Sequence, residues 1–135
     1  MNIKLPAALC ALALAGSASA TGAYDSYKIR ITGFVPVICH ATLDASMVPT
    51  EEGQVSLGAL NEFCNSPNGY QVYVDSSPEL ADASLIVDGE AFDLSENGST
   101  LVSTSSHANI ASRDVALDLP EGVEGGSLSV RIVAL

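Results

Sequence analysis

The sequence predicts an all-β domain, an antiparallel sandwich or barrel, on three observations. Short segments alternate apolar and polar residues with a period of two, as half-buried strands do. Clusters of Gly, Pro, Asn and Asp separate these segments at regular spacing and predict tight turns. No window of eleven or more residues shows convincing helical spacing. Trp is absent and aromatics are few, so the predicted core is built from Val, Ile, Leu and Ala.

The first twenty residues are typical of a cleavable secretion signal. Lys4 supplies the positive start, residues 5–16 form an apolar run, and 17–20 (Ser-Ala-Ser-Ala) carry the small residues that a signal peptidase requires. We expect cleavage between Ala20 and Thr21. A membrane anchor is the alternative, but the run is too short to cross a bilayer, and no later stretch is apolar enough to do so. The sequence therefore predicts an exported protein, in transit through a periplasm to the cell surface or beyond.

Residues 21–135 have the length of one domain with a modest core. The chain has a formal net charge of −11, and the loss of Lys4 with the signal takes it to about −12. The acidic residues are scattered rather than clustered, which is typical of a solvated surface. Such a surface repels nucleic acid and anionic lipid, so neither is expected as a partner.

Two cysteines remain after signal removal, Cys39 and Cys64. An even number of cysteines in an exported chain favours a disulfide. The alternatives are a metal pair or a nucleophile. His40 adjoins Cys39, but on a strand it points to the opposite face, so a metal site is disfavoured. A disulfide here would stabilise the fold by roughly 3.5 kcal/mol in the chain-entropy model.

Taken in chain order, the first predicted strand covers residues 27–39, where the odd positions are mainly apolar and the even positions begin polar. Gly33 and Pro36 interrupt the pattern and predict a kink or an edge position. The second predicted strand covers 55–60. Residues 65–69 (Asn-Ser-Pro-Asn-Gly) form a strong turn signal, and a third strand follows over 70–75.

Shorter segments follow in the second half of the chain. Residues 78–83 are expected to form one helical turn, and Asp88-Gly89 predicts a hairpin between 84–87 and 90–94. Further strands are expected at 101–102 and 115–119. The last predicted strand covers 128–133, where Leu128, Val130 and Ile132 alternate with polar residues before Val133.

Catalytic and cofactor patterns are weak. His40 and His107 are the only histidines, and the Ser/Thr-rich stretch before His107 lacks the G-x-S-x-G pattern of a nucleophile elbow. The residues around Asp88 lack the spaced acidic ligands of a calcium loop, although adventitious calcium on so acidic a surface stays open. We expect no enzyme activity, no cofactor and no dedicated metal site.

Four segments of the chain resemble chaperone–usher pilins and spore-coat-U-like subunits of archaic pili. Residues 31–39 (ITGFVPVIC) are similar to the first pilin strand, which leads into a Cys, and 55–60 (VSLGAL) resemble the following V-x-L-G. Cys64 with 69–77 (GYQVYVDSS) resembles the Cys plus G-Y-x-V-x-V stretch, and 127–135 resemble the last pilin strand. The match is weak between residues 80 and 125, and the chain ends without the usual aromatic residue.

This resemblance implies an immunoglobulin-like sandwich of six strands that lacks the seventh, so a groove stays open until another chain fills it. A periplasmic chaperone would fill the groove first, and the N-terminal extension of the next subunit would replace it at an outer-membrane usher. The donor-strand candidates are Tyr27, Ile29, Ile31 and Gly33. The candidates for the edges of the acceptor groove are Val35, Val37, Leu128, Val130 and Ile132.

Two functions therefore stay open on the sequence. The first is a structural subunit of a surface fimbrium, assembled by donor-strand complementation and supporting cell adhesion and biofilm formation. The alternative is a self-contained secreted or periplasmic β-sandwich that binds a ligand or partner. A hydrolytic activity that depends on His40 and His107 is a distant third.

Overall fold

The computed structural model describes residues 28–49, 53–123 and 125–135. The chain divides into two compact units, Met1–Gly33 and Phe34–Leu135. The predicted signal peptide, its cleavage site at Ala20 and Thr21, and the donor candidate Tyr27 lie outside the described residues. Of the first unit, residues 28–33 are described, and they form no helix or strand. The side chains of Ile29 and Ile31 are 84% and 90% exposed there.

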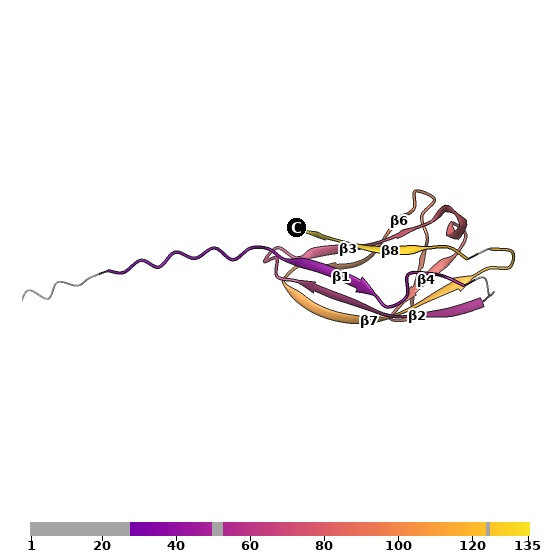
Figure 1. Cartoon of the computed structure of the whole chain (residues 1–135), viewed down its shortest axis with the longest axis horizontal. Coiled ribbons are helices and arrows are strands. Elements are labelled where there is room, and N and C mark those ends of the chain that lie inside the picture. The colour runs from indigo at the N-terminus through magenta and orange to yellow at the C-terminus, as the bar shows by residue number, and fades with distance from the viewer. Residues whose placement is uncertain (1–27, 50–52, 124) are drawn as a thin grey trace, which may run out of the picture. The chain divides into compact units, whose positions relative to one another are not determined.

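The second unit is an antiparallel β-sandwich (Figure 1). One sheet has five strands in the order β1-β2-β7-β4-β5, and the other has three in the order β6-β3-β8. The strands are β1 (Cys39–Leu43), β2 (Gly53–Cys64), β3 (Tyr70–Ser76), β4 (Ser84–Val87), β5 (Glu90–Asp93), β6 (Ser99–Ser105), β7 (Asn109–Leu119) and β8 (Leu128–Ala134). A single 3₁₀ turn, η1 (Pro78–Leu80), follows β3, and the described residues contain no helix long and apolar enough to span a membrane.

The core lies between the two sheets and is aliphatic, as the composition predicts. Alternate residues of each strand point inward, so β3 contributes Tyr70, Val72 and Val74, all fully or almost fully buried. Leu80 of η1 is also buried and packs into the same cluster. The sheets twist over a core of Leu and Val with Tyr70 as its largest fully buried side chain.

Two glycines are required by the backbone that they adopt. Asp88 and Gly89 both have positive φ, 49° and 85°, which is the conformation of a two-residue hairpin turn between β4 and β5. Gly58 has a φ of 82° at an irregularity in the β2–β7 pairing, and a Cβ there would lie 2.7 Å from the Cβ of Asp44. The Asp44 carboxylate uses this space to accept a hydrogen bond from the Ala59 amide.

Three sequence expectations need correction. The predicted first strand over 27–39 does not form in its described part, where residues 28–38 carry no strand and β1 begins only at Cys39. Val35 and Val37, expected on an acceptor edge, are 79% and 54% exposed and lie upstream of β1. The described residues form eight strands rather than six, because β4 and β5 make a separate hairpin that completes the five-stranded sheet.

The other expected elements are confirmed. The hairpin at Asp88-Gly89, the helical turn after β3 and the third and last strands lie where the sequence predicts them. Cys39 and Cys64 form the predicted disulfide, which joins directly paired residues of β1 and β2. The second strand is longer than predicted and runs from Gly53 to Cys64.

Candidate strand-acceptor flank

One side of the sandwich is formed by two neighbouring edge strands, β1 of the five-stranded sheet and β8 of the three-stranded sheet. We call this pair the β1–β8 flank (Figure 1). The two strands contact one another along their length, yet neither sheet pairs them. Each strand therefore has one paired side and one side without a strand partner among the described residues.

The inward side chains of this flank are apolar and only half-buried. They pack against the core cluster but stay partly accessible, in contrast to the fully buried core residues of β3. They are Cys39, Ala41 and Leu43 on β1, and Val130 and Ile132 on β8. Leu128, at the start of β8, is buried. Covering a row of half-buried aliphatic groups with another strand removes apolar surface from water, which lowers the free energy.

The hydrogen-bonding pattern shows which backbone groups of β8 are free. The Leu135 amide donates to the Gly69 carbonyl, and the Ser77 amide donates to the Ser127 carbonyl. Odd-numbered residues of β8 therefore face β3, because backbone groups alternate sides along an antiparallel strand. The N–H and C=O groups of Val130, Ile132 and Ala134 point the other way, toward β1.

The same alternation applies to β1. The Asn65 amide donates to the Ile38 carbonyl, and the Asp44 amide donates to the Ala59 carbonyl. Even-numbered residues of β1 therefore face β2, and the odd-numbered residues Cys39, Ala41 and Leu43 direct their backbone groups toward β8. The flank thus combines half-buried apolar side chains with two facing rows of backbone groups that have no strand partner in the described part of the chain.

The chain closes this flank at one end only. An isolated bridge joins Met47 to Ser127, with hydrogen bonds from the Leu128 amide to the Ser46 carbonyl and from the Val48 amide to the Gly126 carbonyl. Continued from this bridge, the register would place Asp44 opposite Val130. The Asp44 amide is already bonded to β2, so the ladder cannot extend into β1 without a shift of one residue. Register conflict therefore keeps β1 and β8 unpaired.

The flank must widen to accept a strand. Cα atoms of β1 and β8 approach within 8 Å of one another. A strand inserted between them needs two inter-strand spacings, about 9.6 Å in total. A separation of the two edges by a few ångströms, around the Met47–Ser127 bridge, is therefore part of any strand-binding event.

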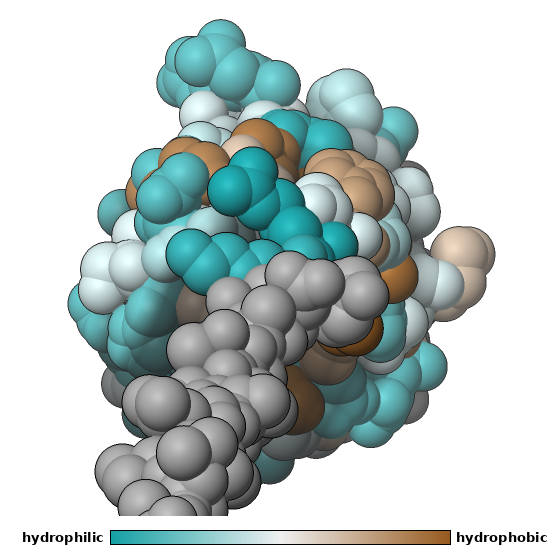
Figure 2. All heavy atoms as spheres, turned by 90° about the vertical axis from the view of Figure 1, so that its left-hand side faces the viewer, coloured by the Kyte–Doolittle hydropathy of each residue, from teal (hydrophilic) through white to brown (hydrophobic). Residues whose placement is uncertain are grey.

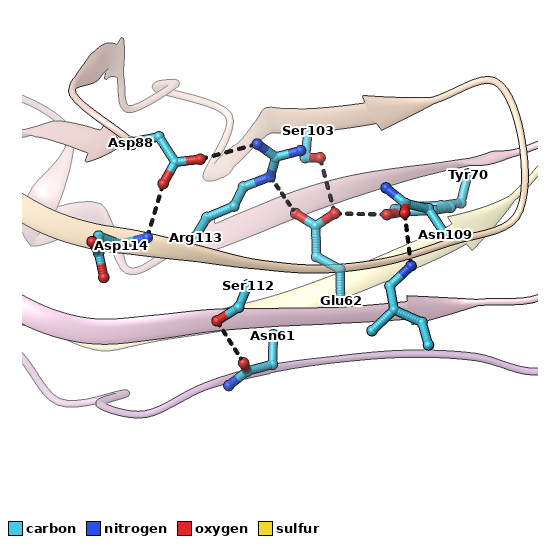
Figure 3. A network of polar contacts seen from close by, with 10 residues as sticks. Asn61, Glu62, Tyr70, Asp88, Ser103, Asn109, Ser112, Arg113 and Asp114 are labelled. Atoms are coloured by element: carbon cyan, nitrogen blue, oxygen red, sulfur yellow. Dashed lines mark hydrogen bonds and ion pairs between the residues drawn. The ribbon is translucent and has the colours of Figure 1, made fainter.

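A buried polar network links the two sheets (Figure 3). The side chain of Glu62 on β2, adjacent to β1, has no exposed surface. Its Oε2 accepts hydrogen bonds from the Tyr70 hydroxyl at 2.8 Å and the Ser103 hydroxyl at 3.1 Å. Its Oε1 pairs with Arg113 Nε at 3.1 Å, and Arg113 Nη1 pairs with Asp88 at 3.1 Å. The buried carboxylate is therefore satisfied on both oxygens.

Electrostatics follow from this arrangement. Burial, together with its hydrogen bond to Glu62, raises the pKa of the Tyr70 hydroxyl to about 12. Partial burial of Arg113 lowers its pKa, but the nearby carboxylates of Glu62 and Asp88 outweigh that effect and raise it overall. A neutral tyrosine and a charged guanidinium are thus the forms that the folded chain stabilises at neutral pH.

A second apolar feature lies on the outer face of the five-stranded sheet. The rings of His40 and Phe63 stack with centroids 5.1 Å apart, and Ile110, paired with Phe63, is 76% exposed. These residues line a shallow surface pocket of about 510 Å³ with Asn61 and Ser112. On the face shown in Figure 2, hydrophilic residues predominate and hydrophobic residues form only small separate areas.

The predicted site residues divide between the two units. Ile29, Ile31 and Gly33 lie in the exposed segment of the first unit, and a Cβ on Gly33 would meet nothing within 4 Å. Leu128, Val130 and Ile132 lie in β8, on the β1–β8 flank, whereas Val35 and Val37 lie upstream of β1. Ala41 and Leu43 take their place on the β1 edge. The sequence signal was present, because the odd-numbered apolar alternation continues past Cys39.

The candidates for catalysis are not brought together. His40 of β1 stacks on Phe63 of β2, while His107 lies in the loop between β6 and β7, where its Nδ1 is 3.4 Å from the Ser106 hydroxyl. Among the residues that the structure describes, no three His, Cys, Asp or Glu side chains are grouped to hold a metal ion. Comparison of the chain with protein-family models, curated proteins and solved structures gave no match.

Proposed function

We propose that this protein is a structural subunit of a surface fibre, in which the β1–β8 flank of one copy binds the segment that precedes β1 in another copy. The observation that carries the proposal is the flank itself, with half-buried apolar side chains and facing unpaired backbone groups. Strand addition satisfies both at once, because main-chain bonds complete the edge and alternate side chains cover the apolar row.

The donor is the segment over residues 27–35. Its odd positions carry Ile29, Ile31, Gly33 and Val35, and its even positions begin with Lys28 and Arg30. A strand of this pattern places one apolar face against the flank and one charged face in water. The described apolar residues of this segment are exposed, so their burial supplies free energy for binding, roughly 1.5–3 kcal/mol for each aliphatic side chain.

Export and assembly partners belong to the same proposal. The predicted signal peptide delivers the chain out of the cytoplasm, and a periplasmic chaperone covers the flank until an outer-membrane usher brings in the next subunit. The assembled fimbrium supports adhesion and biofilm formation at the cell surface. An exposed edge with apolar side chains aggregates readily, which is why a chaperone strand is expected before assembly.

A pair of aspartate substitutions tests the function. The exported chain is purified and run unheated on a denaturing gel, where fibre subunits joined by inserted strands form a ladder of multimers. Ile31→Asp places a charge on the apolar face of the donor segment and should abolish the ladder. Thr32→Asp places the same charge on the opposite face and should leave it intact.

The self-contained binding module is the alternative outcome of this experiment. A wild-type chain that stays monomeric at every concentration, with a cooperative unfolding transition, would contradict the fibre function. Loss of the ladder in both aspartate variants would show that charge alone, rather than the apolar face, controls assembly.

A further inference from the structure

Asn65 holds the residues that lead into β1. Its side-chain carbonyl accepts a hydrogen bond from the Ile38 amide at 2.6 Å, and its side-chain amide donates to the Pro36 carbonyl at 2.9 Å. Its backbone amide donates to the Ile38 carbonyl at 3.1 Å. One residue therefore makes three hydrogen bonds to a segment that forms no strand.

These bonds fix the direction of residues 36–38 relative to β1. Ile38 lies opposite Asn65 in the register that pairs β1 with β2, and the Cys39–Cys64 disulfide adjoins this pair. Residues 36–38 therefore continue the direction of β1 and are hydrogen-bonded to Asn65, the residue that follows β2. The β1–β8 flank lies on the other side of β1.

For the donor segment to cover its own flank, the chain must reverse direction just before Cys39. A reversal by a two-residue turn cannot present the correct face. Such a turn, at residues 37–38, pairs odd-numbered residues with even-numbered ones, so the even face of the donor would lie inward, with Phe34 beside Ala41 and Thr32 beside Leu43. The odd face, with Ile29 and Ile31, would then point away from the apolar row.

A three-residue loop over 36–38 would restore the apolar face, because it pairs Val35 with Cys39 and Gly33 with Ala41. Two of those loop residues, Pro36 and Ile38, are the ones that Asn65 binds. Their sequence, Pro-Val-Ile, also opposes the turn, since the last loop position favours a left-handed backbone that β-branched residues avoid. A five-residue loop over 34–38 includes the same held residues.

We propose that Asn65 directs the donor segment to a second copy of this chain, by preventing the reversal that would let the segment fill its own flank. This inference rests on the proposed function, because it presumes that the segment binds a β1–β8 flank. Asn65 acts as a positioning residue for assembly and makes strand exchange intermolecular. A chain without this restraint fills its own flank and ends as a closed monomer.

The test uses trypsin sites that the donor segment already contains. Lys28 and Arg30 lie in the exposed segment, so trypsin cuts there while the segment is free and stops cutting once it is inserted as a strand. The exported chain is purified, separated into monomer and multimer by size exclusion, and each fraction is digested and weighed by mass spectrometry. Asn65→Ala removes both side-chain bonds, and Asn97→Ala, in the turn before β6, is the matched control.

We expect wild-type and Asn97→Ala monomers to be cut and their multimers to be protected. Asn65→Ala should raise the share of trypsin-protected monomer about tenfold, as the loss of two hydrogen bonds allows, with a matching fall in multimers. Ile38→Gly keeps Asn65 but eases the turn, and it should shift the partition in the same direction. This variant carries the test if Asn65→Ala fails to fold.

Two results would contradict the account, one through the role of Asn65 and the other through the fibre function itself. Protected multimers of the wild type, combined with unprotected monomers of both Asn65→Ala and Ile38→Gly, would overturn the role of Asn65 and leave the fibre function standing. A wild-type chain without multimers, cut at Lys28 and Arg30 at every concentration, would instead overturn the fibre function and this inference with it.

Discussion

The two lateral flanks of this sandwich manage their open edges in opposite ways. The β1–β8 flank presents half-buried aliphatic side chains, whereas the flank formed by β5 and β6 places the acidic side chains of Glu90 and Asp93 on a strand of only four residues. Short strands and charges are how proteins prevent edge-to-edge association. Under the proposed function, this difference protects one flank against strand addition and leaves the other able to accept a strand.

The difference is also visible in the side chains of β6 and β8, the two edges of the three-stranded sheet. β6 is rich in hydroxyl side chains, such as Ser99, Thr100 and Thr104, which solvate an exposed edge. β8 alternates aliphatic residues with Ser129 and Arg131, and its aliphatic residues face the core. Under the proposed function, the edge that binds a strand has an accessible aliphatic row, and the edge that stays free carries mainly hydroxyl side chains.

The largest expected effect comes from a charge placed on the β1–β8 flank. Ile132→Asp puts a carboxylate in the row that a donor strand would bury, and we expect the multimer population to fall about a thousandfold. The measurement is the ladder on an unheated denaturing gel, with quantification by light scattering.

Leu101→Asp, on β6, is the matched control, and its multimers should match those of the wild type. Chemical unfolding of both monomers must show that Ile132→Asp still folds. Equal loss of multimers in the two variants would break the distinction between the flanks.

Removal of Arg113 tests the link between the sheets separately from either flank. Arg113→Ala leaves the Glu62 carboxylate buried without its cation, and we expect the free energy of unfolding to fall by about 3–5 kcal/mol. Urea denaturation followed by circular dichroism measures this loss. A change of less than about 1 kcal/mol would show that the buried network does not stabilise the packing of the sheets.

High pH should weaken the same network through Tyr70. Its pKa is raised from 10.0 to about 12 in the folded chain. The corresponding stability is complete below pH 10, where both states are protonated, and is lost as the pH rises from about 10 toward 12. We expect a loss of about 2 kcal/mol over that range, measured by urea denaturation at pH 9 and pH 11.5.

The control for this prediction is Tyr70→Phe, which removes the ionisable hydroxyl. Its unfolding free energy should depend less steeply on pH over the same interval. An identical slope in the variant and the wild type would place the alkaline sensitivity elsewhere in the chain.

The smallest expected effect comes from the turn between β4 and β5, which leads into the edge strand of the flank formed by β5 and β6. Gly89 has a φ of 85°, so Gly89→Ala forces a Cβ into a left-handed backbone and should cost about 1 kcal/mol. Thermal unfolding measures this cost. The multimer ladder should stay unchanged, because β5 lies at the opposite edge of the five-stranded sheet from β1. A change in the ladder would show that the two flanks are coupled.

Sequence reasoning predicted the sandwich, the disulfide and the Asp88-Gly89 turn, because period-two alternation and turn residues are local signals. It placed the first strand too early, since the alternation over 27–39 does not reveal whether a partner strand lies beside each residue. The same alternation contains both the exposed segment and β1, and only the pairing with β2 separates them.

The buried network and the restraint at Asn65 could not be predicted from the sequence. Glu62 sits at an inward position of β2, where an acidic residue gives no sign of partners on β3, β6 and β7. Asn65 is part of a sequence that predicts a turn, and its hydrogen bonds to residues 36–38 depend on a strand register fixed by the tertiary fold. Both features join segments far apart in the chain.

Hydrogen exchange at single residues of β8 tests most directly whether the β1–β8 flank accepts a strand from another copy. In the isolated monomer, the amides of Val130, Ile132 and Ala134 should exchange rapidly, while those of Ser129, Arg131 and Val133, bonded to β3, exchange slowly. In multimers the first set should become as slow as the second. Slow exchange of both sets in the monomer would contradict the claim, because the chain would then close its own edge.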